Sequence, residues 1–155
     1  MANERIPYNE QHFSNRFSQM GDIAEGAFER VNPTAHRLGM NRPAFNMMTM
    51  KPIIRNTPDY LLPSGFYEVM GISSRGDGTL KLKFEKIQSL MSWSLLHPCY
   101  LWVWDSSKKR WWCDSIQDWN MACEQHAEVD RFPDNNKPYW KLHYSNFPSG
   151  PNSEI

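Results

Sequence analysis

The chain has 155 residues, 40% of them hydrophobic and 14% aromatic, which is enough for one domain that folds without disulfides or a structural metal. Its 17 Lys and Arg residues balance 17 Asp and Glu residues, so any affinity for nucleic acid has to come from how charge is distributed. The three cysteines lack C-x-x-C pairing, which argues against a disulfide framework and a zinc site. No apolar run approaches about 18 residues and no secretory signal is evident, so we expect a cytoplasmic protein that does not span a membrane.

The N-terminal third of the chain is expected to hold one helix. Residues 1–11 are polar, and we expect them to be flexible. Over residues 12–31, apolar residues recur at spacings of three and four, which predicts a helix that Gly21 could divide in two. Residues 32–56 contain three prolines, so we expect a long connection there, with room for one strand.

The middle of the chain is predicted to hold three short strands. The first is expected at residues 59–62, and a Pro-Ser-Gly turn follows it at 63–65. Two further strands are expected at 66–72 and 79–84, separated by the turn sequence Arg-Gly-Asp-Gly at 75–78. The sequence therefore predicts that strands 66–72 and 79–84 pair with each other as an antiparallel hairpin.

A helix, two strands and a second helix are expected to follow. Apolar residues at helical spacing predict a helix over residues 85–96. The dense apolar run at 99–104 predicts a strand, which turns and returns at 110–113. The next helix is predicted to run from an N-cap at Ser115 to His126.

This order of elements predicts a single-domain α/β fold. Helix, strands, helix, strand and helix follow one another, as in a mixed sheet flanked by helices. We expect a flexible N-terminus at residues 1–11, the domain itself at 12–128, and an extended C-terminal arm at 129–155, where four prolines occur.

Three acidic residues are candidates for one metal site. Hydrolysis of a phosphodiester needs a neutralised phosphate, an activated water and a stabilised leaving oxygen, and Mg²⁺ held by carboxylates can supply all three. Asp59 and Glu68 converge if the strands on either side of the 63–65 turn run side by side. Glu25 on the first helix could add a third ligand, although Asp22 and Glu25 also fit a capping box. The pattern predicts Glu25, Asp59 and Glu68 as ligands of Mg²⁺ or Mn²⁺.

A cation beside these acids is the next candidate, because positive charge near the scissile phosphate stabilises the transition state. Met70 shares the strand face of Glu68, but a thioether carries no charge. In the predicted hairpin, Lys83 and Lys81 return to that same face, so either could be the catalytic cation. Gln88, in the first turn of the next helix, could also approach the site, and a solvated glutamine is an equal alternative.

Other residues are candidates for contact with nucleic acid. Lys108, Lys109 and Arg110 lie at the tip of a predicted hairpin and could grip phosphates together with Lys81 and Lys83, although a solvated turn is the ordinary alternative. The four tryptophans of this hairpin could stack on bases, but their alternation along two paired strands favours packing in the core.

The segments around the acids resemble a known nuclease family. A helix glutamate, a Pro-Asp pair and a strand glutamate resemble the PD-(D/E)xK nuclease superfamily, and in particular the endonuclease I type of Holliday-junction resolvase from short-tailed phages. The stretch TPDYLLPSG at 57–65 is similar to that family's strand and turn nearly letter for letter, and ACEQH at 122–126 resembles part of its late helix. The resemblance implies Glu25, Asp59 and Glu68 as the metal-binding acids.

The same resemblance implies a restriction-endonuclease-like fold, a homodimer, and cleavage of branched DNA with Mg²⁺, in the host cytoplasm if the chain is phage-encoded. The sequence departs from the family at Met70, where the family has lysine, in the shorter interval from Asp59 to Glu68, and in a neutral, aromatic C-terminal tail. The main hypothesis is a metal-dependent, junction-resolving DNA endonuclease. The alternatives are a catalytically impaired protein of the same fold that binds DNA or a protein partner, and a structural phage protein with no nucleic-acid role.

Overall fold

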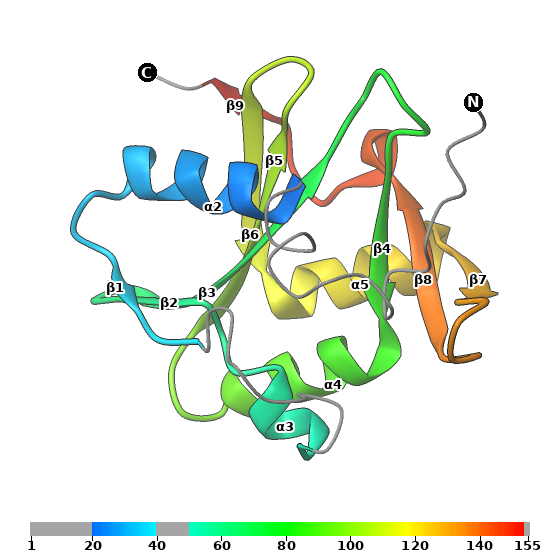
Figure 1. Ribbon diagram of the computed structural model, residues 1–155, viewed down its shortest axis with the longest axis horizontal. Helices are drawn as coiled ribbons and strands as arrows, with labels where there is room; N and C mark the ends of the chain where they lie inside the picture. Colours follow the sequence, from blue (N-terminus) through cyan, green and yellow to red (C-terminus); the bar gives the residue numbers. More distant parts are fainter. Residues whose placement is uncertain (1–19, 40–49, 154–155) are drawn as a thin grey trace, which may run out of the picture.

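The fold is built around a six-stranded mixed sheet (Figure 1). The computed structural model describes residues 20–39 and 50–153 of the chain. The strand order is β1-β2-β3-β5-β6-β9, in which β3 and β5 pair in parallel and the other neighbours pair antiparallel. These strands are β1 (His36–Arg37), β2 (Tyr60–Leu62), β3 (Gly65–Ile72), β5 (Cys99–Asp105), β6 (Arg110–Ser115) and β9 (Asn152–Ser153).

A second, three-stranded sheet overturns the predicted hairpin. It consists of β4 (Thr79–Lys83), β8 (Pro138–His143) and β7 (Glu128–Arg131), in that order and antiparallel throughout. The prediction that strands 66–72 and 79–84 pair with each other is therefore wrong. The reason is that β2 and β5 occupy the two edges of β3, so β4 has no free edge there and pairs with β8 instead.

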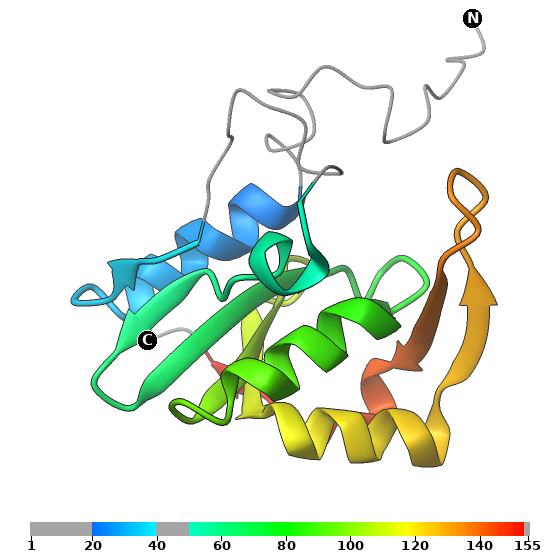
Figure 2. The ribbon, with the colours of Figure 1, turned by 90° about the horizontal axis from the view of Figure 1, so that it is seen from below.

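Helices cover both faces of the six-stranded sheet (Figure 2). α2 packs on one face, and α4 and α5 pack on the other. The short helix α3 lies against α4. The helices are α2 (Met20–Val31), α3 (Pro52–Arg55), α4 (Phe84–Trp93), α5 (Ile116–His126) and the 3₁₀ helix η3 (Tyr144–Asn146).

Side-chain alternation along β3 and β5 gives the sheet an apolar core on each face. Val69 and Trp102 belong to the core under α2, where the Phe28 ring meets the Trp102 ring edge-on at 5.3 Å between centroids. Leu101 belongs to the core under α4 and α5. Because successive strand residues point to opposite faces, Glu68 projects on the α4 side, opposite to Val69.

The predicted α/β class and single domain are confirmed. Within the described residues, the predicted helices and strands from residue 59 to residue 126 are present, with ends shifted by at most three residues. Ser115 caps α5 as predicted, since its hydroxyl accepts the Asp118 backbone N–H at 3.2 Å. None of the described helices is long and apolar enough to cross a membrane.

The structure describes most of the C-terminal end of the chain but not its first 19 residues. Residues 1–11, predicted to be flexible, and residues 12–19, predicted to be helical, lie outside the described residues. The predicted C-terminal arm, residues 129–155, provides β8 at the centre of the second sheet and β9 at the edge of the first. It also places Phe147 in the core under α5.

Candidate active site

The structure brings Asp59 and Glu68 together from adjoining strands. Asp59 directly precedes β2, and Glu68 lies in the middle of the partner strand β3. The Asp59 Oδ2 accepts a hydrogen bond from the backbone N–H of Val69 at 2.9 Å, which holds the carboxylate beside Glu68. The turn between the strands requires Gly65, whose φ is 150° and whose Cβ position would collide with the carbonyl of Pro98.

A lysine from the flanking helix joins these acids. The Nζ of Lys86 lies 2.6 Å from Oε2 of Glu68, whose side chain is only 6% exposed. Lys86 belongs to the first turn of α4, on the side of β3 from which Glu68 projects. The other Glu68 oxygen, Oε1, is buried with no hydrogen-bond partner among the described residues. A buried carboxylate with one oxygen unsatisfied is costly, so this group can accommodate a further positive or hydrogen-donating partner.

The pKa of Asp59 reflects burial of the carboxyl beside a second acid. Burial raises the pKa of the Asp59 carboxyl well above its usual range, and the negative charge of Glu68 raises it further. The charge of Lys86 and the hydrogen bond from Val69 act in the opposite direction, but they do not offset these effects. Glu25 adds a smaller upward contribution. Strongly shifted carboxyl groups beside a specific charged partner are concentrated at functional sites.

Glu25 approaches Asp59 from the opposite face of the sheet. It projects from α2 and forms a two-point ion pair with Arg37 of β1, at 2.9 Å and 3.0 Å between nitrogen and oxygen. Arg37 also donates to the Tyr60 hydroxyl at 2.9 Å. Asp22 lies inside α2 rather than before it, so a capping box does not account for Glu25. We refer to the following five residues as the acid site: Glu25, Arg37, Asp59, Glu68 and Lys86.

The ligand chemistry of the acid site fits a divalent metal held by two carboxylates. Among residues 20–39 and 50–153, no three His, Cys, Asp or Glu side chains are arranged as a group that could hold a metal ion. The predicted third ligand, Glu25, is paired with Arg37. Mg²⁺ prefers six oxygen ligands but commonly takes only one or two from carboxylates and the others from water and substrate phosphate. Asp59 and the unsatisfied oxygen of Glu68 are the two carboxylate groups here that could hold such a metal.

The two lysines predicted as catalytic lie on the second sheet. The Nζ of Lys83 is 5.4 Å from the centre of the Phe132 ring, and that of Lys81 is 6.0 Å from the centre of the Tyr139 ring. Because β4 pairs with β8, the predicted placement of these lysines across from Met70 is wrong. Met70 packs against the apolar core on the α4 side, so the cation next to Glu68 comes from the helix and not from a neighbouring strand.

In the basic turn predicted to bind phosphates, Arg110 is engaged in structural contacts. The Nε of Arg110 lies 3.0 Å from Oδ2 of Asp105, and its guanidinium lies over the Trp112 ring at 5.0 Å. Lys108 and Lys109 are exposed in the turn between β5 and β6. Core packing is confirmed for three of the four tryptophans of this hairpin, which are at most 2% exposed: Trp102, Trp104 and Trp112.

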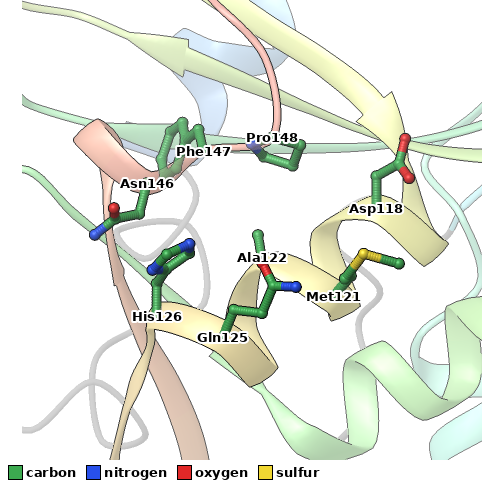
Figure 3. Close-up of a pocket in the computed structure, with 8 residues that line it drawn as sticks. All are labelled: Asp118, Met121, Ala122, Gln125, His126, Asn146, Phe147 and Pro148. Atoms are coloured by element: carbon green, nitrogen blue, oxygen red, sulfur yellow. The ribbon is translucent and has the colours of Figure 1, made fainter.

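A pocket of about 350 Å³ lies between α5 and the segment that follows η3 (Figure 3). Ala122, Met121 and Phe147 contribute apolar walls, and Asp118 and His126 lie toward its two ends. None of the acid-site residues lines this pocket. It therefore has no direct part in the chemistry of the acid site.

No protein-family model, curated protein or solved structure matches the chain. The acid site includes two cations that the sequence prediction missed, Lys86 and Arg37. Lys86 had a usable signal, because it lies four residues before buried Leu90 and so shares the sheet-facing side of α4, whereas Gln88 is exposed. Arg37 had none, since its pairing with Glu25 depends on how β1 folds against α2.

Proposed function

We propose that this protein is a Mg²⁺-dependent DNA endonuclease with a restriction-endonuclease-like fold. The observation that carries the proposal is the meeting of Asp59, Glu68 and Lys86. Two acids from adjoining strands repel each other there, and a lysine lies within hydrogen-bonding distance of one of them. This is the set of groups that the sequence resemblance implies for a PD-(D/E)xK nuclease, with Lys86 in place of a lysine at Met70.

Each residue has a definable part in the proposed reaction. A divalent metal on Asp59 and Glu68 would neutralise the scissile phosphate and lower the pKa of a bound water. Lys86 keeps a positive charge beside Glu68, where it can hold a phosphate oxygen and stabilise the negative charge that develops on it. The backbone N–H of Val69 fixes the Asp59 carboxylate, and Arg37 fixes Glu25.

The sequence resemblance extends this proposal to the substrate and the assembly. It implies branched DNA as the substrate, a homodimer as the working unit and Mg²⁺ as the metal. We include Mn²⁺ as an alternative metal, and the place of action is the host cytoplasm if the chain is phage-encoded. The zero net charge means that DNA affinity has to come from local groups of basic residues.

The deciding experiment incubates the protein with four-way junction, nicked and linear duplex DNA in Mg²⁺ or Mn²⁺. We expect the junction to be cut and Asp59→Asn to abolish cutting. The matched control is Glu124→Gln, which removes a negative charge from an exposed position on α5. An endonuclease is ruled out if the pure protein cuts none of these substrates, or if Asp59→Asn cuts as well as the wild type.

A second candidate is a protein of the same fold that binds DNA, or a protein partner, without cutting. It is favoured by Met70, which packs in the core, and by the engagement of Glu25 with Arg37. DNA binding that weakens steeply with salt, combined with no metal-dependent cleavage of any substrate, would identify this alternative.

A further inference from the structure

A second charged group lies at the start of α4, one residue away from the acid site. The carboxylate of Glu85 accepts a hydrogen bond from Nη2 of Arg55 at 2.6 Å and two from Nζ of Lys137, at 3.1 and 3.3 Å. Arg55 ends α3, and Lys137 directly precedes β8 in the hairpin that stands beside the start of α4 (Figure 2). One carboxylate therefore holds cations from two distant parts of the chain.

Positive charge exceeds negative charge around Glu85. Lys83 is the N-cap residue of α4, immediately beside this group. Burial lowers the pKa of the Lys83 ammonium, and the positive charges of Lys86, Lys137 and Arg55 lower it further, against an upward contribution from Glu85. We refer to Arg55, Lys83, Glu85 and Lys137 as the basic cluster. Arg55 and Lys137 share the Glu85 carboxylate and Lys83 adds a third positive charge nearby, and such crowding of cations is unfavourable unless an anion relieves it.

The basic cluster is held in position by contacts that do not involve its charges. α3 is fixed to α4 by the Trp93 indole N–H, which donates to the Ile53 carbonyl at 3.1 Å. The Asn56 amide adds a hydrogen bond to the Ser89 hydroxyl at 3.4 Å. Both contacts flank Arg55, whose side chain is only 12% exposed. Its guanidinium is therefore already oriented, which lowers the entropy cost of binding an anion.

We infer that the basic cluster binds a backbone phosphate of the DNA next to the acid site, with Glu85 occupying the phosphate position until DNA arrives. This inference rests on the proposed function for its ligand. Glu85 and Lys86 are consecutive, so the two residues present one charge to the basic cluster and one to the acid site. A phosphate that displaces Glu85 gains charge-assisted hydrogen bonds from Arg55 and Lys137. A DNA strand held at this point would lead to Lys86, the next residue of α4.

The displacement makes an unusual prediction, because loss of Glu85 should strengthen binding. Glu85 competes with phosphate for the same cations. Glu85→Gln removes this competitor and also removes the repulsion between the Glu85 carboxylate and the DNA phosphate. A purely structural role predicts the reverse, since loss of the ion pairs would loosen Arg55 and Lys137. Lys137→Gln should weaken binding and reduce the slope of log affinity against log salt by about 1.

The experiment measures binding of a fluorescently labelled four-way junction and its duplex arms to the full chain in EDTA, from low to moderate salt. Glu85→Gln is expected to tighten binding about threefold or more, and Lys137→Gln and Lys83→Gln to weaken it about threefold to tenfold. The controls are Glu124→Gln and Arg75→Gln, which each remove one charge of the same sign at an exposed position, on α5 and in the turn between β3 and β4. Thermal melting of each variant confirms that it is folded.

Tightening by Glu85→Gln together with weakening by Lys137→Gln supports the phosphate subsite. The subsite is overturned if Glu85→Gln binds as the wild type or more weakly, if Arg75→Gln has as large an effect as Lys137→Gln, or if no binding occurs at low salt. Because metal is absent, the result is separate from the cleavage assay. A protein that shows these binding changes but cuts no DNA retains the subsite and loses the endonuclease proposal.

Discussion

Asp105 and the pair formed by Asp59 and Glu68 lie on neighbouring parts of the central sheet and have opposite environments. Asp105, the last residue of β5, is fully buried and accepts hydrogen bonds from the backbone N–H groups of Ser74 and Ser107 at 3.1 Å and from Arg110 at 3.0 Å. Burial acts to raise the pKa of Asp105, but these donors outweigh it and leave that pKa lowered. Asp105 is thus a satisfied anion that ties two loops together.

The Asp59 and Glu68 pair lies about four residues from Asp105 along the paired strands, or roughly 13 Å, and the described residues do not satisfy all of its oxygens. One backbone N–H and one lysine serve two carboxylates, one Glu68 oxygen has no partner among the described residues, and the pKa of Asp59 is raised. A buried acid with enough donors needs no further function to explain it. An acid pair short of donors is where a ligand with positive charge would be stabilised.

The largest expected effect is the difference in DNA cleavage between substitutions of Asp59 and of Asp105. Asp59→Asn should reduce DNA cleavage by about 10⁴-fold, because it removes a metal-binding carboxylate. Asp105→Asn should leave the cleavage rate of the folded protein within about threefold, since Asp105 is bonded to loop residues at the end of β5. Initial cleavage rates on the preferred DNA substrate test this difference. Equal losses from both variants would remove the distinction between a functional and a structural acid.

Lys86 provides the next test, because it serves Glu68 as Arg110 serves Asp105. Lys86→Met should reduce cleavage by up to about 10³-fold, and Lys83→Met should reduce it much less. Adding Met70→Lys to Lys86→Met should restore part of the rate, since Met70 lies on the same strand face as Glu68. A larger loss from Lys83→Met than from Lys86→Met would contradict the assignment of Lys86.

The sequence was sufficient for the elements of this region but not for how the strands pair. Period-two alternation and turn residues predicted the strands at 66–72 and 79–84, and the structure contains both. Their pairing depends on competition for the edges of β3, which β5 wins although it is more distant in the sequence. A local sequence pattern contains no information about such a competition. The wrong strand pairing in turn led to the wrong prediction for the positions of Lys81 and Lys83.

The acids were predictable because they lie close together in the sequence, on either side of one turn. Asp59 and Glu68 are linked by a short loop, so their convergence follows from local geometry. Lys86 and Arg37 reach the acid site through tertiary packing of α4 and β1. A helical periodicity argument could have identified Lys86 as sheet-facing, but it could not have shown which strand residue it meets.

Substitutions of Asp105 and Asp59 should also differ in their effect on stability, by less than they differ in their effect on cleavage. Asp105→Ala should lower the free energy of unfolding by about 3 kcal/mol, because it leaves Arg110 and two backbone N–H groups without their acceptor. Asp59→Asn should leave stability unchanged or raise it by about 1 kcal/mol, because it removes a charge that burial and the repulsion with Glu68 disfavour, and keeps an acceptor for Val69. Urea denaturation at neutral pH measures both values, and strong destabilisation by Asp59→Asn would place that residue among the structural acids.

The smallest expected effect concerns how stability changes with pH, which should have opposite signs for Asp105 and Asp59. The lowered pKa of Asp105 means that its contribution to stability is present above its unfolded pKa of about 4 and is lost as the pH falls through the folded value. The raised pKa of Asp59 means that the folded state holds a proton which the unfolded state has released above about pH 4. Stability attributable to Asp59 is therefore present at low pH and declines as the pH rises toward its raised folded pKa.

This decline should be absent in Asp59→Asn, since the amide does not titrate. The stability gained by Asp59→Asn relative to the wild type should grow upward from about pH 4, at no more than about 1.4 kcal/mol for each pH unit, and level off above the folded pKa. Urea denaturation of both proteins from pH 4 to 8 measures this gain, and Glu124→Gln controls for the loss of a carboxyl group in general. A gain that stays constant across this range would show that burial and Glu68 do not raise the pKa of Asp59, and the acid site would then resemble the satisfied environment of Asp105.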